Sequence, residues 1–145
     1  MELTTLDFGL RISCALLCGL AIGFERQWHH KSAGLRTNTL VAVGSALFVI
    51  LSVQLIKGET DPTRVLGQVV TGVGFLGAGI IYKEGLNIHG LTTAATIWCS
   101  SAIGCLAAVG YFRETFMATA IILFINALLL PLDNWLSNRK NQSNS

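Results

Sequence analysis

Residues 61–79 read DPTRVLGQVVTGVGFLGAG, and this apolar, glycine-rich stretch decides how the chain is organised. Asp61 can accept hydrogen bonds from the free backbone N–H groups at the start of a helix. Pro62 suits the first helical position, where no N–H is needed. The stretch therefore predicts a helix that begins at Pro62 and continues through a long apolar run.

The glycines of this stretch predict where its neighbours lie. At about 100° of rotation per residue, Gly72 and Gly79 share one face, and Gly74 and Gly77 lie roughly opposite. Small residues let helix backbones approach closely in lipid. Glycine on two faces predicts neighbours on two sides, so we expect this helix to be buried at the centre of a helical bundle.

The run 72–77 also matches the pattern GxGxxG, which marks a dinucleotide site in a different context. That site needs a preceding strand and an acidic residue about 20 positions later. Here the glycines lie within an apolar run, and residues 91–110 contain no Asp or Glu. The nucleotide interpretation is rejected, and no cofactor is expected.

Composition places the whole chain in the membrane class. Of its 145 residues, 52% are AVILMFWYC, 15 are glycines and only 12% are charged. Soluble domains carry about 25% charged residues, and a small domain needs them to cover its surface. The disordered, collagen-like and disulfide-rich classes do not fit. A net charge of +2, without a basic cluster, also argues against binding to nucleic acid.

Five apolar runs are long enough to cross a bilayer, which takes about 20 residues in a helix. They are continuous and lack the alternation of β-barrel strands. We predict an all-α integral membrane protein, a bundle of five transmembrane helices with helix three central. The transmembrane domain covers residues 1–137, followed by a polar cytoplasmic tail at 138–145. The predicted spans are residues 6–24, 39–56, 62–82, 92–112 and 116–135.

The positions of Lys and Arg predict the orientation, because cytoplasmic segments carry an excess of both. Alternate segments on one side hold six, which exceed the three on the other. This excess predicts a periplasmic N-terminus and a cytoplasmic C-terminus, with the inverted topology as the alternative. The first span lacks the basic start of a signal peptide, so we expect it to be retained. The six are Arg26, Lys31, Arg36, Lys83, Arg139 and Lys140, and the three are Lys57, Arg64 and Arg113.

Polar residues flank spans one and two on the same side. Glu25, Arg26, Arg36 and Asn38 form either a charged cluster that ties the two helices together or ordinary solvated helix ends. The neighbouring pair of histidines at 29–30 does not share a helix face and has no evident third ligand, so no metal site is predicted.

A second polar group accompanies helix three. Asp61 and Gln68 lie on the face of Gly72 and Gly79 if the helix is regular from its first turn, and Arg64 lies about 60° away. This group is either a polar vestibule for a cation or partner, or a capped helix end whose arginine reaches to the interface.

Five blocks of the sequence resemble the membrane domain of the MgtC/SapB family, in the family's order and spacing, over about residues 6–135. One block alone would be a weak signal, and the linked set makes the resemblance specific. The blocks are GFERQ at 23–27, GLRTN at 34–38, DPTRV at 61–65, QVVTGVGFLGAG at 68–79 and GLTTAA at 90–95.

The resemblance implies a bacterial inner-membrane protein with five helices, linked to magnesium limitation and, in pathogens, to survival inside host cells. It implies a small regulator of other membrane proteins, with the ATP synthase and magnesium pumps as suggested partners. Many members continue into a soluble cytoplasmic domain, which we expect this chain to lack. The implied functional positions are Glu25, Arg26, Arg36, Thr37, Asn38, Asp61, Arg64 and Gln68, with helix-packing positions at Gly72, Gly74, Gly77 and Gly79.

We therefore expect a non-enzymatic membrane regulator tied to magnesium or proton homeostasis, since no catalytic grouping is visible in the sequence. The expected partners are other membrane proteins, the lipid bilayer and a second copy of the chain. The alternative is a small transporter or channel for magnesium or another cation, which the stripe of Asp61 and Gln68 favours. Against it, no span carries a carboxylate near its middle, where cation carriers usually place one.

Overall fold

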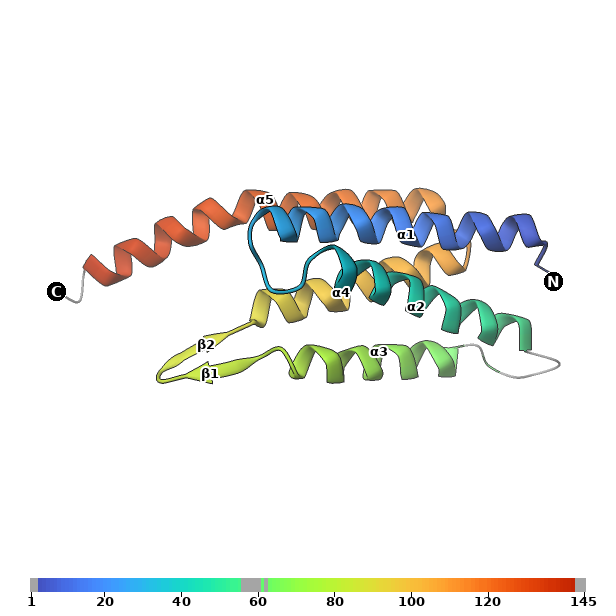
Figure 1. The fold of residues 1–145 in the computed structure, drawn as a ribbon, viewed down its shortest axis with the longest axis horizontal. Helices are drawn as coiled ribbons and strands as arrows, with labels where there is room; N and C mark the ends of the chain where they lie inside the picture. The colour runs from blue at the N-terminus through green and yellow to red at the C-terminus, as the bar shows by residue number, and fades with distance from the viewer. Residues whose placement is uncertain (1–2, 56–60, 62, 143–145) are drawn as a thin grey trace.

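The computed structural model describes residues 3–55, 61 and 63–142, with side chains described through Pro131. Helices that follow one another along the chain run in opposite directions, and a short hairpin joins the third helix to the fourth (Figure 1). The elements are α1 (Thr5–Trp28), α2 (Leu35–Leu55), α3 (Thr63–Ala78), β1 (Tyr82–Glu84), β2 (Asn87–His89), α4 (Leu91–Ala108) and α5 (Phe112–Gln142).

Four of these helices have the length and hydropathy of membrane spans. They are α1, α2 and α4 over their whole lengths and α5 over Phe112–Pro131. The prediction of an all-α integral membrane protein with five helices is confirmed, and four of the five predicted runs coincide with these spans. The chain is a multi-pass membrane protein.

Helix α3 is shorter than the predicted span at 62–82. It ends at Ala78, where the N–H of Gly79 donates to the carbonyl of Phe75 at 3.1 Å and the backbone turns. Its 16 residues extend about 24 Å, which is less than the roughly 30 Å of bilayer hydrocarbon. The antiparallel hairpin that follows was not predicted, and it pairs Tyr82 with His89.

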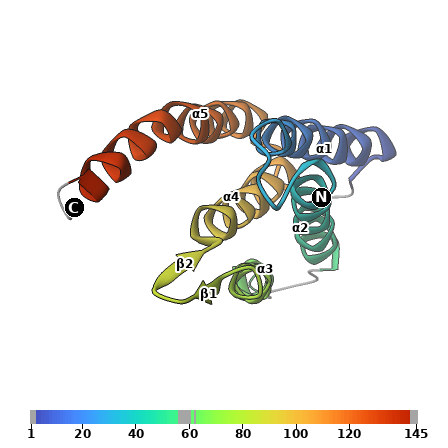
Figure 2. The ribbon, with the colours of Figure 1, turned by 60° about the vertical axis from the view of Figure 1, so that its left-hand side comes forward.

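Helix α4 lies at the centre of the bundle, and the prediction that helix three is central was wrong. Helix α4 packs against all four other helices, whereas α3 makes its main contacts with α4 and α2 at one edge (Figure 2). Of the residues in the α4 span, 56% are buried, compared with 33% in α1 and 39% in α2. The buried face of α4 is made of small and weakly polar side chains, which allow neighbours to approach on several sides.

The glycines that bring helices together are mostly not those predicted. A Cβ at Gly104 of α4 would collide with the carbonyl oxygen of Ala42 in α2. A Cβ at Gly19 of α1 would lie 2.9 Å from the Cα of Thr39, and one at Gly23 would lie 2.7 Å from the Cα of Leu35. The tight contacts therefore join α2 to α1 and to α4.

The predicted packing glycines of helix three have different surroundings. Gly77 packs against α4, where a Cβ added to it would lie 3.5 Å from the Cβ of Ala94. Gly72 and Gly74 have open space where a Cβ would stand, and Gly79 lies in the turn beyond α3. None of these three brings α3 close to another helix of this chain, because glycine permits a close approach without requiring one.

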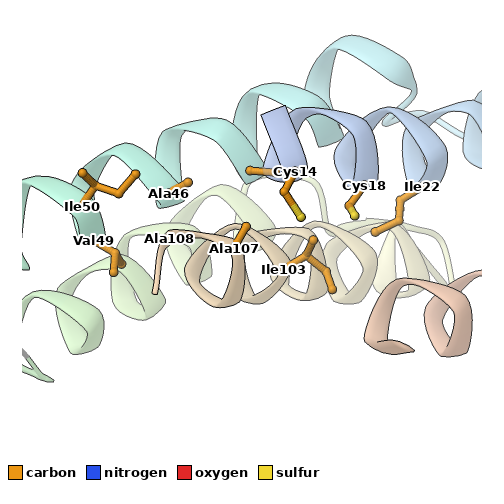
Figure 3. Close-up of a cluster of buried hydrophobic side chains, with 10 residues drawn as sticks. Cys14, Cys18, Ile22, Ala46, Val49, Ile50, Ile103, Ala107 and Ala108 are labelled. Atoms are coloured by element: carbon orange, nitrogen blue, oxygen red, sulfur yellow. The ribbon is translucent and has the colours of Figure 1, made fainter. Parts of the chain in front are cut away.

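A hydrophobic core joins α1, α2 and α4 (Figure 3). Cys14 and Cys18 of α1 are buried in it, one turn apart, and Ile22 continues the same face. These cysteines act as small apolar packing residues. The remaining labelled members are Ala46, Val49 and Ile50 from α2, and Ile103, Ala107 and Ala108 from α4.

The contact of Gly104 with Ala42 predicts a large effect of substitution. We expect Gly104→Leu to destabilise the folded protein by about 1–3 kcal/mol or more, because the side chain must push α2 and α4 apart. The measurement is maleimide labelling of the buried Cys14 and Cys18 in detergent as temperature rises. Gly9→Leu is the matched control, since Gly9 of α1 has open space around it. Equal labelling curves for the two variants would contradict this packing.

Candidate functional site

A buried arginine lies where the end of α1 meets the start of α4. Arg26 is in the last turn of α1 and only 2% exposed. Its Nη2 donates to Oγ1 of Thr93, in the first turn of α4, at 3.0 Å. Its Nε is also buried and has no hydrogen-bond partner among the described residues. A buried charge with so few partners is costly, and in a membrane span it indicates function by default.

The neighbouring acid, Glu25, faces a histidine instead of the arginine. Its Oε1 lies 2.9 Å from Nδ1 of His29, one turn further along the chain. Its Oε2 is buried and has no partner among the described residues. Adjacent residues on a helix point about 100° apart, which explains why Glu25 and Arg26 do not pair with each other.

Asn38 connects three parts of the chain at the same end of the bundle. It is fully buried, and its Nδ2 donates to the carbonyls of Ala33 at 2.8 Å and Gly34 at 3.1 Å. Its Oδ1 accepts from the hydroxyl of Ser100 at 2.8 Å. The amide therefore ties the connection between α1 and α2 to the side of α4.

Of the predicted functional residues, Glu25, Arg26 and Asn38 gather at this end. Arg36 and Thr37 lie beside them at the start of α2 with exposed side chains. We call Glu25, Arg26, His29, Asn38, Thr93 and Ser100 the polar cluster.

The other predicted residues lie elsewhere. Helix α3 begins at the opposite end of the bundle (Figure 1), and Asp61 and Arg64, at its start, are exposed. Asp61 accepts from the N–H of Thr63 at 2.9 Å and from its hydroxyl at 2.7 Å, as the predicted cap requires. These hydrogen bonds lower the pKa of Asp61 below its usual value. Gln68, further along α3, is also exposed.

Gln68 and Gly72 line an apolar groove between α2 and α3. Its volume is about 520 Å³, and α2 contributes Gly44 and Phe48 to its wall. Of the face predicted for Asp61, Gln68, Gly72 and Gly79, Gln68 and Gly72 line this groove, and Asp61 and Gly79 do not.

A further face of α3 points away from the bundle. Gly67, Thr71, Gly74 and Ala78 recur at helical spacing, and all four are exposed. A Cβ at Gly67 or at Gly74 would meet nothing within 4 Å. We call these four residues the small-residue stripe of α3.

Thr93 and Ser100 belong to the polar cluster, and neither was among the functional positions expected from the sequence. Their spacing of seven residues places them on one helix face, and this was the available signal. The hydrogen-bond partners of this face could not be predicted from the sequence, because Arg26 and Asn38 lie more than sixty positions away in the chain.

Among the described residues, no group of three or more His, Cys, Asp or Glu side chains is arranged to hold a metal ion. The polar cluster offers a cation, an amide and hydroxyl groups, together with one carboxylate that faces an imidazole. Such a set can hold helices in register and can receive a polar group from outside.

Comparisons with known proteins agree with one another. The family model described as MgtC family matches residues 12–135. A Brucella abortus relative, Protein MgtC, is 58% identical over 118 residues, which cover 81% of this chain and 49% of the relative. Protein MgtC of Salmonella typhimurium strain LT2 is 50% identical over 120 residues, 83% of this chain and 51% of the relative.

An uncharacterized protein of Synechocystis is 48% identical over 130 residues, which cover 90% of this chain and 55% of the relative. The chain thus spans about half the length of the curated relatives it matches. No solved structure matches it at a significant level. The family model and these relatives cover most of the chain, and the chain belongs to the MgtC family.

Proposed function

We propose that this chain is a non-enzymatic regulator in a bacterial inner membrane, linked to magnesium or proton homeostasis. It acts by binding other membrane proteins through its helix surfaces, with its N-terminus in the periplasm and its C-terminus in the cytoplasm. Membership of the MgtC family supports this role, and so does the small-residue stripe of α3.

The stripe carries the proposal because of where it lies. Within lipid, helices associate by close packing of small residues, since the surrounding acyl chains are as apolar as the helices. Gly67 and Gly74 have no close neighbour within this chain. A helix from another protein can therefore approach α3 as closely as α2 approaches α4 at Gly104.

The candidate partners follow from the family resemblance. They are the ATP synthase, a magnesium pump and a second copy of the chain. Each supplies membrane-spanning helices, and a single face of α3 accepts one of them at a time. Regulation then takes the form of competition for this face.

The polar cluster contributes by holding α4 and α1 together behind the face that binds. Arg26 bonds Thr93 in the first turn of α4, and the turn before it leads directly from the hairpin and α3. A partner that moves α3 therefore also moves the start of α4, where Arg26 is hydrogen-bonded to Thr93.

The stripe is tested by Gly74→Leu. We expect this variant to fold normally, because the new side chain enters open space, and to lose crosslinking to its partners in native membranes. We also expect it to lose the ability to support growth in low magnesium and at acid pH in a strain that lacks the gene. Gly9→Leu again serves as the control. Crosslinking and growth equal to those of the parent would reject the stripe as a binding face.

The role of Arg26 is tested with two variants. We expect Thr93→Val to lower the free energy of unfolding by about 1.5–3 kcal/mol, because it removes the hydrogen bond to a buried charge. The double variant Arg26→Met/Thr93→Val should regain this stability, because apolar side chains of similar volume replace a buried charge well.

We expect the double variant to remain unable to support growth in low magnesium. Thermal unfolding in detergent and growth of the complemented strain are the two measurements. Full growth with the double variant would mean that Arg26 serves only to hold the fold.

A further inference from the structure

A cleft of about 500 Å³ opens beside the end of α1, on the outside of the bundle. Two aromatic rings form its wall, those of Phe24 at 56% exposed and Trp28 at 71% exposed, with centroids 5.8 Å apart. Gln27, His30 and Leu35 complete the lining. Aromatic rings at the end of a membrane span lie at the depth of lipid headgroups.

The backbone at His30 has an unusual conformation. Its φ is 53°, and it is the one non-glycine residue with positive φ among the described residues. The N–H of His30 donates to the carbonyl of Gln27 at 3.0 Å, and the N–H of Lys31 donates to that of Arg26 at 2.9 Å. This pair of bonds ends a helix with a left-handed residue that is usually glycine. An imidazole here strains the turn while placing a polar ring at the cleft.

The exposed charges around this turn are positive. Lys31 follows His30, and Arg36 follows Leu35, so each exposed cation is the next residue in the chain after one that lines the cleft. The nearest acid along the chain, Glu25, is mostly buried and faces His29. Glu84, on the separate hairpin, lies 3.9 Å from His89.

A ligand that fits must carry a negative charge and also have an apolar part. Free phosphate would use the cations and leave both aromatic rings exposed. A zwitterionic lipid would use the rings and add no net charge. An anionic phospholipid satisfies both, because its phosphate and its chains meet at the depth of the interface.

We propose that this cleft binds the headgroup of an anionic phospholipid. His30, Lys31 and Arg36 face its phosphate, and Phe24 and Trp28 contact its glycerol and the first part of its chains. The site is separate from the polar cluster and from the small-residue stripe of α3.

Trp28 reports on the site once Trp98→Phe and Trp135→Phe leave it as the sole tryptophan. The full chain in detergent micelles is titrated with phosphatidylglycerol or phosphatidylcholine, both with brominated chains that quench tryptophan on contact. We expect half-maximal quenching at an about tenfold lower fraction of phosphatidylglycerol, since each cation near the phosphate adds to the attraction.

Two variants and one control locate the binding. Lys31→Gln/Arg36→Gln should abolish the preference for phosphatidylglycerol, whereas Lys83→Gln, at the exposed Lys83 of β1, should keep it. His30→Gly should raise the thermal stability by relieving the strained turn and still lower the preference severalfold.

The opposite results would overturn the proposal. These are equal quenching by the two lipids, an unchanged preference in either cleft variant, or release of the lipid by millimolar inorganic phosphate. The last result would identify the site as one for a free anion.

Discussion

The close contact of α4 with α2 at Gly104 and Ala42 is the constraint on which the rest of the bundle depends. The hydrophobic effect contributes little to helix association in lipid. How closely two helix backbones can approach therefore decides which helices pair. Only a helix with small side chains on several sides can be approached by four others. Helix α4 is that helix, and Ser45 and Ser101 add a hydrogen bond of 2.7 Å beside the tight contact.

The two arginines of α1 hold α4 at both of its ends. Arg11 donates to the carbonyl of Ala108, where the negative end of the α4 dipole favours a cation. Arg26 sits at the other end, beside Thr93, where the positive end of the α4 dipole disfavours one. The first contact needs no explanation beyond stability. The unfavourable position of Arg26 is partly offset by the negative C-terminal end of α1 itself. The electrostatic cost that remains is the physical reason to assign Arg26 a role beyond packing.

Composition and hydropathy predicted the spans, because the bilayer requires long apolar helices whatever those helices pack against. Packing partners were less predictable, since glycine marks where a close approach is allowed and not where it occurs. A second helix lies close to Gly104, whereas the space beside Gly72 is open.

The candidate site was half predicted. Asn38 was found by its place at a span end, but its partner Ser100 was not among the predicted positions, because a hydroxyl on a small-residue helix gives no sign of its acceptor. The hairpin after α3 was missed because each of its strands is only three residues long, too short for a pattern of alternating side chains to indicate a strand.

The short length of α3 links the hairpin to the open face. Exposed hairpin edges cannot lie in hydrocarbon, where unpaired backbone groups are costly, so β1 and β2 must stand in the headgroup region or beyond it. Leu86, at the turn, is 96% exposed. Asp61 must reach water at the other end of the helix. A helix of about 24 Å is then stretched between two surfaces roughly 30 Å apart, and the bilayer thins around it at a cost. Under the proposed function, a partner helix along Gly67 and Gly74 would replace the thinned lipid on that side, so the mismatch would favour binding at the stripe.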